Sequence, residues 1–210
     1  MMLDDIGLKN GTDKASDRND FLRRYEPFLE RHRDRKVKLL EIGVLGGSSI
    51  RTWRDYFSEG EIIGADINPE VTQYAGERIS IEIIDQGKPA DLDKLACKGP
   101  YDVIIDDGSH LWEHQILTLR KLLPALKPGG VFIIEDLDTS HGKYRKQYGT
   151  PGTLTATEYL QRISDWVIGI WVSSREEVED NFIIEAGRDL EFVAFLRGAA
   201  VLRKKLPELK

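Results

Sequence analysis

Four carboxylates and a histidine follow two short apolar segments of the chain. The segment 101–107 runs into the pentapeptide DDGSH (residues 106–110), and the segment 131–136 ends in Glu135 and Asp136. Carboxylates gathered at one place repel one another unless a cation neutralises them, and no lysine or arginine lies between Asp107 and His110. Oxygen ligands favour Mg²⁺ or Mn²⁺ over zinc. We therefore expect a divalent metal among these acids, although helix caps and surface acids could give the same pattern.

His110 is the candidate general base, because it follows Asp107 by three residues and begins a long predicted helix. An imidazole in that place could take a proton from a hydroxyl group bound to the metal. A histidine near the start of a helix is also a common capping or packing residue. His114 lies one turn further on and supports His110 or the substrate, or pairs with His110 as a zinc ligand. The role of His141 stays open.

A glycine-rich turn follows the apolar segment 37–42 and contains Gly43, Gly46 and Gly47. Glycine lets the backbone turn tightly and approach a ligand closely. The turn lacks the G-x-G-x-x-G spacing of dinucleotide-binding folds and the Lys-Ser/Thr pair of a phosphate loop. Glu41 precedes the glycines, and its carboxylate would repel a pyrophosphate but attract a cation such as the sulfonium of S-adenosylmethionine. The same turn also occurs between a strand and a helix where no ligand binds.

Two further acidic positions follow the next predicted strands. Asp66 ends the segment 61–66, about twenty residues after the glycines, where an acid accepts the two ribose hydroxyls of a nucleoside. The alternative is that Asp66 caps the following helix. Asp85 and Gln86 end the third strand, where an adenine amino group would lie, although Asp-Gln is also ordinary loop chemistry. We add Asp106 to this predicted set of cofactor-binding residues.

These residues need strands and helices that bring them to one place. Nearly all-apolar strands that alternate with helices are typical of a parallel sheet covered on both faces, that is, a doubly wound α/β fold. The tail then contains two strands joined by Arg197-Gly198, which predicts an antiparallel hairpin. The predicted fold is a Rossmann-like, seven-stranded, mostly parallel sheet, the plan of class I methyltransferases. The expected strands are 37–42, 61–66, 80–85, 101–107, 131–136, 190–196 and 199–205, and the expected helices are 48–57, one beginning at Pro69, 90–97, 111–126 and 153–169.

Two regions depart from this alternation. Residues 1–35 form an expected N-terminal helical segment, and residues 137–152 form a long loop that we expect at the active site. We expect both to shape the acceptor pocket of a single domain over residues 1–210. A further apolar group belongs either to the core or to an interface, which leaves a homo-oligomer possible. This group is Trp166, Ile168, Ile170 and Trp171.

Composition limits the classes of partner. The net charge of −6 and the pI near 5.4 argue against a nucleic-acid partner, which requires a basic face. No stretch approaches the ~20 apolar residues that span a bilayer, and no signal peptide is evident. The single cysteine, Cys97, is expected to be a small buried residue and cannot form an intramolecular disulfide. We expect a soluble, cytoplasmic protein without a membrane partner.

The chain resembles the metal-dependent sugar O-methyltransferases of natural-product biosynthesis, the macrocin and mycinamicin O-methyltransferase group. The resemblance implies that Asp107, Glu135 and Asp136 bind Mg²⁺ and that His110 is the general base. His110 also takes the place that a catalytic lysine has in the similar catechol-type enzymes. The shared pieces are GTDK (11–14), EIG (41–43) with GGS (46–48), DQ (85–86), IIDDGSH (104–110), HQ (114–115) and EDL (135–137) with TS (139–140).

The resemblance thus implies an S-adenosylmethionine-dependent, Mg²⁺-assisted O-methyltransferase. Its acceptor would be a small molecule that offers a sugar or polyol hydroxyl, such as a sugar or a glycosylated natural product. A metal-dependent hydroxylase or hydrolase could use the same carboxylates, but neither needs a ribose acceptor at Asp66 or the cation-favouring Glu41. A cofactor-binding protein without catalytic activity is the third interpretation, and the complete set of His110 and acids disfavours it.

Overall fold

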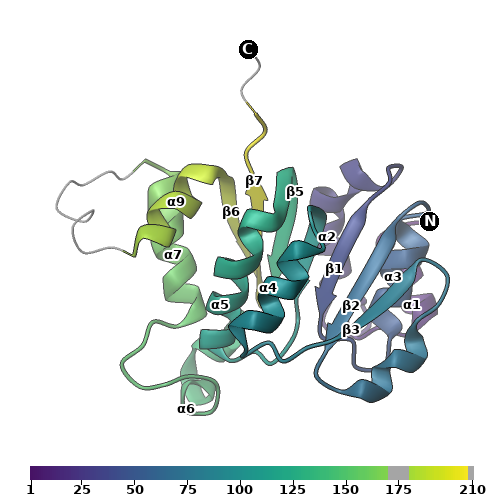
Figure 1. Ribbon diagram of the computed structural model, residues 1–210, viewed down its shortest axis with the longest axis horizontal. Helices are drawn as coiled ribbons and strands as arrows, with labels where there is room; N and C mark the ends of the chain where they lie inside the picture. Colours follow the sequence, from purple (N-terminus) through teal and green to yellow (C-terminus); the bar gives the residue numbers. More distant parts are fainter. Residues whose placement is uncertain (170–179, 208–210) are drawn as a thin grey trace.

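One seven-stranded sheet forms the centre of the molecule, in the order β3-β2-β1-β4-β5-β7-β6 (Figure 1). The computed structural model describes residues 1–169 and 180–207. Strands β1 to β5 pair in parallel, and β7 runs antiparallel to both β5 and β6. The predicted fold class is confirmed. The strands are β1 (Lys38–Ile42), β2 (Glu61–Asp66), β3 (Ile79–Ile83), β4 (Tyr101–Asp106), β5 (Leu126–Ile134), β6 (Leu190–Leu196) and β7 (Ala199–Lys204).

Helices cover both faces of the sheet because successive strand residues point to opposite sides. Leu39, Val103 and Val131 belong to one apolar cluster, and their neighbours Leu40 and Ile104 belong to the other. The first cluster includes side chains from α1 (Leu3–Asn10), α2 (Leu22–Leu29) and α3 (Ser48–Tyr56). The second includes side chains from α4 (Pro89–Cys97), α5 (Trp112–Leu122), α7 (Ala156–Val167) and α9 (Asn181–Asp189). Figure 1 shows these two groups on opposite sides of the sheet.

The N-terminal segment packs tightly against the rest of the protein. Gly11 caps the C-terminal end of helix α1, and its φ of 71° lies in the left-handed region that glycine tolerates. The Leu3 amide donates a hydrogen bond of 3.0 Å to Glu26 in α2, and α1 also contacts α3. A short 3₁₀ helix, η1 (Glu30–His32), follows α2. The expected helical segment is therefore present as two helices and one turn, with an irregular stretch between α1 and α2.

Several predicted boundaries were wrong for local reasons. The helix expected after Pro69 is a 3₁₀ helix, η2 (Pro69–Tyr74). The helix expected to reach residue 126 ends at Leu122, because Pro124 lacks a backbone N–H and forces a short η3 (Leu123–Ala125). Strand β5 then begins at Leu126, earlier than expected, and ends two residues early at Ile134, which leaves Glu135 and Asp136 beyond the strand.

The expected loop at 137–152 contains short helical turns before α7 begins. They are η4 (Leu137–Ser140), η5 (Gly142–Tyr144) and α6 (Arg145–Tyr148). Helix α7 starts at a capping box in which the Thr155 hydroxyl accepts from the Glu158 amide at 3.0 Å. The start of this helix is thus fixed three residues later than expected.

Two expectations about single residues have a definite outcome. Cys97 is exposed, so the expectation of burial was wrong; it lies at the end of α4, where only one face of the helix packs on the sheet. Trp166 is buried in the core, whereas Ile168 is 70% exposed. Ile170 and Trp171 lie outside the described residues. Across residues 1–169 and 180–207, no helix has both the length and the apolar character required to cross a membrane.

Candidate active site

The predicted site residues follow strand ends that lie at one level of the sheet. Ile42 at the end of β1 pairs with Asp106 at the end of β4, and Asp106 pairs with Ile134 at the end of β5. Gly43 and Asp107 therefore emerge side by side, with Glu135 next to them. The strand order reverses between β1 and β4, the place where open α/β sheets bind ligands beyond the carboxyl ends of their strands.

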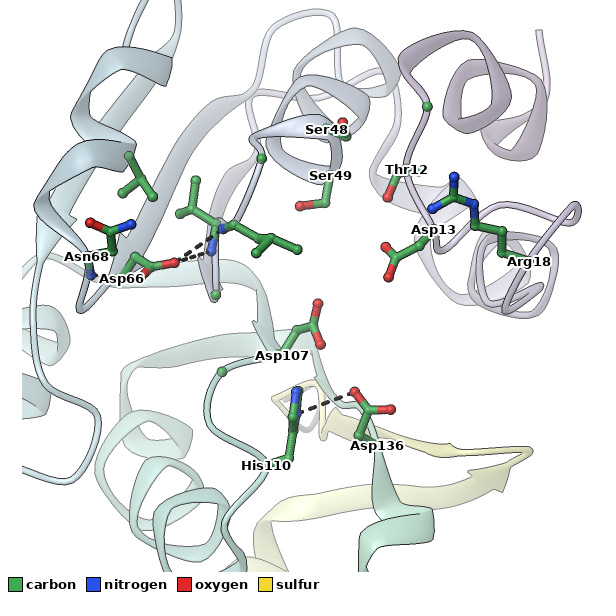
Figure 2. A pocket seen from close by; sticks show the side chains of 17 residues that line it. Thr12, Asp13, Arg18, Ser48, Ser49, Asp66, Asn68, Asp107, His110 and Asp136 are labelled. Atoms are coloured by element: carbon green, nitrogen blue, oxygen red, sulfur yellow. Dashed lines mark hydrogen bonds and ion pairs between the residues drawn. The ribbon is translucent and has the colours of Figure 1, made fainter. Parts of the chain in front are cut away.

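A cavity of about 490 Å³ lies at this edge, and Figure 2 shows the side chains around it. One wall is the glycine turn with Ser48 and Ser49, and a second is formed by Asp66 and Asn68 after β2. The floor is formed by residues that follow β4 and β5. The loop between α1 and α2 completes the enclosure, so that five separate segments of the chain meet at one space. The residues of the floor and of the N-terminal wall are Asp107, Gly108, His110, Asp136, Gly11, Thr12, Asp13 and Arg18.

The glycine turn is shaped by the close approach of two loops. Gly43 has a φ of +94°, and a Cβ atom there would lie 2.0 Å from the carbonyl oxygen of Asp107. Only glycine fits this place. Gly46 also lines the cavity and has open space around its Cα, whereas a side chain at Gly47 would meet the ring of Tyr74. The structure thus brings Gly43 and Gly46 to the cavity, and Gly47 serves the packing of the turn.

Asp66 holds the glycine turn in place and also faces the cavity. Its Oδ2 accepts hydrogen bonds from the amides of Val44 at 2.8 Å and Leu45 at 3.2 Å (Figure 2). Its Oδ1 accepts from the Asn68 amide at 2.9 Å. The cap of the following helix η2 is Asn68, which accepts from the amide of Glu70. The interpretation of Asp66 as that helix cap is therefore wrong; its carboxylate instead accepts from three backbone amides and also lines the cavity.

A second cavity of about 200 Å³ adjoins the first, and Gly43, Asp66 and Gly108 line both. Its walls include the apolar side chains of Ile67 and Ile84 together with the predicted pair Asp85 and Gln86. Branched apolar side chains beside a few polar groups suit a flat heteroaromatic ring. His114 also lines this cavity, and its Nδ1 lies 2.8 Å from the Ser109 hydroxyl, so it does not face His110 across a metal.

Gln86 fixes the loop that follows β4. Its amide nitrogen donates to Asp106 at 2.7 Å and to Thr118 at 2.9 Å, and its oxygen accepts from the Ser109 amide at 2.9 Å. The side chain is nearly buried and its hydrogen-bonding groups are largely occupied. Gln86 therefore lines the second cavity chiefly as a support of the loop.

Two predicted cofactor residues lie behind the cavity wall. Glu41 is fully buried and accepts a hydrogen bond from the Ser49 hydroxyl at 2.7 Å. Burial raises the pKa of Glu41 to about 7. Burial likewise raises the pKa of Asp106 to about 7, against the opposing hydrogen bond from Gln86. Neither Glu41 nor Asp106 lines the two cavities, so neither carboxylate is placed for direct contact with a ligand there.

Asp107, His110 and Asp136 form the polar centre of the cavity. One ligand atom from each lies within 4.8 Å of the others, a spacing that could hold a metal ion. His110 Nδ1 is 3.4 Å from Asp136 Oδ2 (Figure 2). His110 and Asp136 both have positive φ angles, 58° and 54°, which non-glycine residues rarely adopt. Strained backbone of this kind concentrates at functional sites.

Lys14 is the residue that sequence reasoning missed. It is 2% exposed, and its ammonium group contacts Asp107 Oδ2, lies 2.7 Å from Glu135 Oε2 and lies 3.8 Å from Glu41 Oε1. Burial would lower the pKa of Lys14, but the nearby carboxylates outweigh burial and hold the pKa well above its usual value. A lysine far from the acids in sequence thus supplies a positive charge that the sequence argument assigned to a metal alone. The signal available in the sequence was the GTDK motif.

Glu135 differs from the other two predicted metal ligands. Its side chain is 1% exposed, and burial raises its pKa well above the usual value. Lys14 occupies Oε2, while Oε1 has no hydrogen bond of normal geometry among the residues that the structure describes; the buried Tyr25 hydroxyl lies near this carboxylate. A buried carboxylate oxygen without a donor is a strong acceptor left unused. The structure therefore places Asp107 and Asp136 on the cavity and Glu135 immediately behind, with one oxygen available. His141 is exposed and lies outside these cavities.

Several known proteins are similar to this chain in sequence and in fold. Residues 40–137 match the model of a methyltransferase domain family. The chain is 35% identical over 168 residues, 76% of its length, to an 8-demethyl-8-alpha-L-rhamnosyl tetracenomycin-C 2'-O-methyltransferase of Streptomyces olivaceus. It is 37% identical over 129 residues, 58% of its length, to the demethylmacrocin O-methyltransferase of Streptomyces fradiae. The matches cover 44% and 32% of those proteins, so the chain spans less than half of each.

A solved structure shows the same arrangement of elements. The MycE methyltransferase from the mycinamycin biosynthetic pathway, in complex with Mg and SAH, aligns with 98% of this chain at a TM-score of 0.86 and 27% identity. The alignment covers 55% of the MycE chain. Sequence, family model and fold agree with one another. The chain has the fold of the class I S-adenosylmethionine-dependent methyltransferases and is similar in sequence to the macrocin and mycinamicin O-methyltransferases.

Proposed function

We propose that this protein is an S-adenosylmethionine-dependent O-methyltransferase that acts on a hydroxyl of a sugar or of a glycosylated natural product, assisted by Mg²⁺ or Mn²⁺. The observation that carries the proposal is the continuity of the cavity from the glycine turn and Asp66 to Asp107, His110 and Asp136. A cofactor held at one end can meet an acceptor activated at the other. Relatives that methylate sugar hydroxyls by name, and the MycE complex with Mg and SAH, support it.

The cofactor residues divide into those that would touch the ligand and those that support them. Asp66 would accept the ribose hydroxyls, and the second cavity beside Asp85 would receive the adenine. The backbone of Gly43 and Gly46 would pass close to the methionine part. The supporting group acts from behind the cavity wall or beneath the turn. That group is Glu41, Gly47, Gln86 and Asp106.

Asp107, Glu135 and Asp136 fit a divalent cation. All three offer oxygen, the ligand atom that Mg²⁺ prefers. The buried Oε1 of Glu135 is the observation that tests the fit, since it has no hydrogen bond of normal geometry in the described residues and a cation could bind there. Lys14 would hold the other oxygen and orient the carboxylate. When bound, the cation lowers the pKa of a hydroxyl group beside it.

The chemistry then requires one proton transfer and one displacement. A ring nitrogen of His110 takes the proton of the acceptor hydroxyl, and Asp136 stabilises the imidazolium that forms, 3.4 Å away. S-adenosylmethionine supplies the methyl group, and S-adenosylhomocysteine leaves. The oxygen forms the new O–C bond as the C–S bond breaks and its electron pair remains on sulfur. The cavity walls keep donor and acceptor in line and displace water.

We also propose that the N-terminal segment and the sheet work as one domain, although the relatives named above are longer. Thr12 and Arg18 line the central cavity, and Lys14 reaches its acidic centre. Of the loop 137–152, Asp138 faces a neighbouring cavity beyond Asp136. The N-terminal segment therefore supplies more of the residues around Asp107 and Asp136, where the acceptor would bind, than the loop 137–152 does.

Calorimetric titration with S-adenosylhomocysteine, with and without Mg²⁺, tests the proposal. The ligand should bind, and Asp66→Asn should lower its affinity about tenfold or more, because a charge-assisted hydrogen bond contributes about 1.5–3 kcal/mol. Asp136→Asn is the matched carboxylate control: it should weaken Mg²⁺ binding and leave the affinity for S-adenosylhomocysteine within about twofold. Absence of binding under both conditions would remove the proposal.

The role of His110 is tested by His110→Ala. The affinity for S-adenosylhomocysteine should persist, and methyl transfer to an L-rhamnosyl glycoside should fall by ~10²–10⁴, the usual loss on removing a general base. Undiminished transfer would assign the base to another residue.

A further inference from the structure

A third cavity lies on the far side of Asp136 from the glycine turn. It has a volume of about 310 Å³ and shares Arg18 and Asp136 with the central cavity. The loop after α1, the beginning of η4 and the β6–β7 turn all contribute to its lining. The Leu137 amide donates to the carbonyl oxygen of Gly198 at 2.9 Å and thereby fixes the β6–β7 turn beside Asp136. The cavity is therefore built from anchored segments, and it meets the central cavity at Asp136, which lies 3.4 Å from His110.

Some charged side chains that line this third cavity form ion pairs, and others do not. Arg24 forms an ion pair of 2.9 Å with Asp20, which Arg23 also binds. Arg18 and Arg197 also line the cavity, and in the described parts of the chain neither guanidinium group has a hydrogen bond or ion pair. With Asp136 assigned to the metal cluster, three arginines therefore face two aspartates, Asp20 and Asp138.

The arginines are held near one another although they are distant in sequence. Hydrogen bonding by Arg23, with the nearby charges of Arg24 and Arg197, lowers the pKa of Asp20, so that carboxylate stays ionised and is already occupied. Arg197 occupies the two-residue turn next to Gly198, whose φ is +77°. The guanidinium group presents several N–H donors in a planar fork that matches a carboxylate or a phosphate. Arg18 and Arg197 are exposed to solvent, and two such forks on one small polar cavity can together bind an anion.

We propose that this third cavity is the acceptor subsite and that it binds a sugar carrying an anionic group, a carboxylate or a phosphate. Arg18 and Arg197 bind the anion, Asp138 accepts a hydroxyl hydrogen bond, and the hydroxyl to be methylated lies at the Asp136 side, within reach of His110. The inference rests on the proposed methyl-transfer function. Phe21 is the only aromatic side chain in the lining, so the subsite selects a hydrophilic ring over an apolar aglycone.

Binding of acidic and neutral sugars to the protein saturated with S-adenosylhomocysteine and Mg²⁺ tests this assignment. The probes are hexuronates, hexose 6-phosphates and the matched neutral hexoses, titrated by calorimetry. One anionic class should bind at least about tenfold more tightly than its neutral partner, since a hydrogen bond to a charged group contributes about 1.5–3 kcal/mol. The class that binds distinguishes a carboxylate from a phosphate.

Variants separate the subsite from general charge. Arg18→Ala and Arg197→Ala should each remove about tenfold or more of that preference. Arg23→Ala is the matched control, because Arg23 is 60% exposed, binds Asp20 and does not line the cavity. Equal binding of acidic and neutral sugars, or a preference that survives both substitutions, would overturn the inference. Failure of S-adenosylhomocysteine to bind in the first step would instead refute the proposed function.

Discussion

Replacing Lys14 with methionine tests how much the buried ion pairs of Lys14 stabilise the fold. Methionine keeps an unbranched, flexible side chain but removes the ammonium group that contacts Asp107, Glu135 and Glu41. Glu41 and Glu135 are 0% and 1% exposed, so water cannot replace the lost charge. Breaking a buried ion pair by removing one partner costs about 3–5 kcal/mol. For a domain of this size the melting temperature should fall by roughly 6–20 °C.

The matched control is Lys94→Met. Lys94 Nζ lies 2.6 Å from Asp91, nearly the same distance as Lys14 from Glu135, but the Lys94 side chain is 71% exposed. Solvent screens an exposed pair, so this variant should melt close to the unchanged protein. Circular dichroism and urea unfolding measure both variants. A Lys14→Met shift no larger than that of Lys94→Met would show that the buried ion pairs of Lys14 do not stabilise the fold.

The deficit of Lys14→Met should also depend on pH. The folded-state pKa of Glu41 is raised to about 7 from 4.5, mainly by burial, so its favourable contribution is present below pH 4.5 and is lost as the pH rises through 7. Without Lys14 the pKa of Glu41 rises further, and ionisation at high pH becomes more costly. The difference in unfolding free energy between the two proteins should therefore grow from pH 5 to pH 8. A constant difference would show that the loss is one of packing.

Two further changes probe the cavity wall and the acid stability. Gly43→Ala should destabilise the fold by about 1–3 kcal/mol and abolish S-adenosylhomocysteine binding in calorimetry, because the φ of Gly43 is +94° and an added Cβ atom would lie 2.0 Å from the Asp107 carbonyl oxygen. Gly46→Ala is the control: Gly46 has open space around it, so this variant should leave the urea midpoint nearly unchanged. Equal effects at both glycines would refute this. Burial lowers the pKa of His32 below 6.5, so the stability that it contributes is present above pH 6.5 and is lost as the pH falls through the lowered pKa. His32→Gln should flatten the decline of the urea midpoint below pH 6.5, and an unchanged decline would assign it to other groups.

The fold could be predicted because its strands obey simple rules. A parallel strand covered on both faces must be apolar almost throughout, and such runs ending in Ile42, Asp106 and Ile134 are visible in the sequence. Strand ends in a parallel sheet lie at one edge, so the acids that follow them were expected to meet. The errors at the start of β5 and at the end of α5 arose where proline and glycine punctuate the chain at several successive positions.

The positions of Lys14 and Glu41 in the site could not be predicted in the same way. Lys14 contacts Asp107 and Glu135 across 93 and 121 residues, and no local periodicity links the loop after α1 to strand ends so distant. The sequence argument placed Glu41 on the cavity because it precedes the glycines, yet strand alternation turns its side chain into the interior toward Lys14. Tertiary packing decided both cases.

Lys14 also changes the charge argument for the metal. Crowded carboxylates were taken to need a divalent cation, but the structure shows that a lysine already neutralises part of their charge. Asp107, Glu135 and Asp136 with one ammonium group leave a formal charge of two negatives, which one divalent cation would balance. Without Lys14 the same three ligands would keep a residual negative charge beside a cationic methyl donor and a hydroxyl that must lose its proton. Residual negative charge opposes that proton loss, so the buried lysine makes the site suitable for general-base chemistry as well as for metal binding.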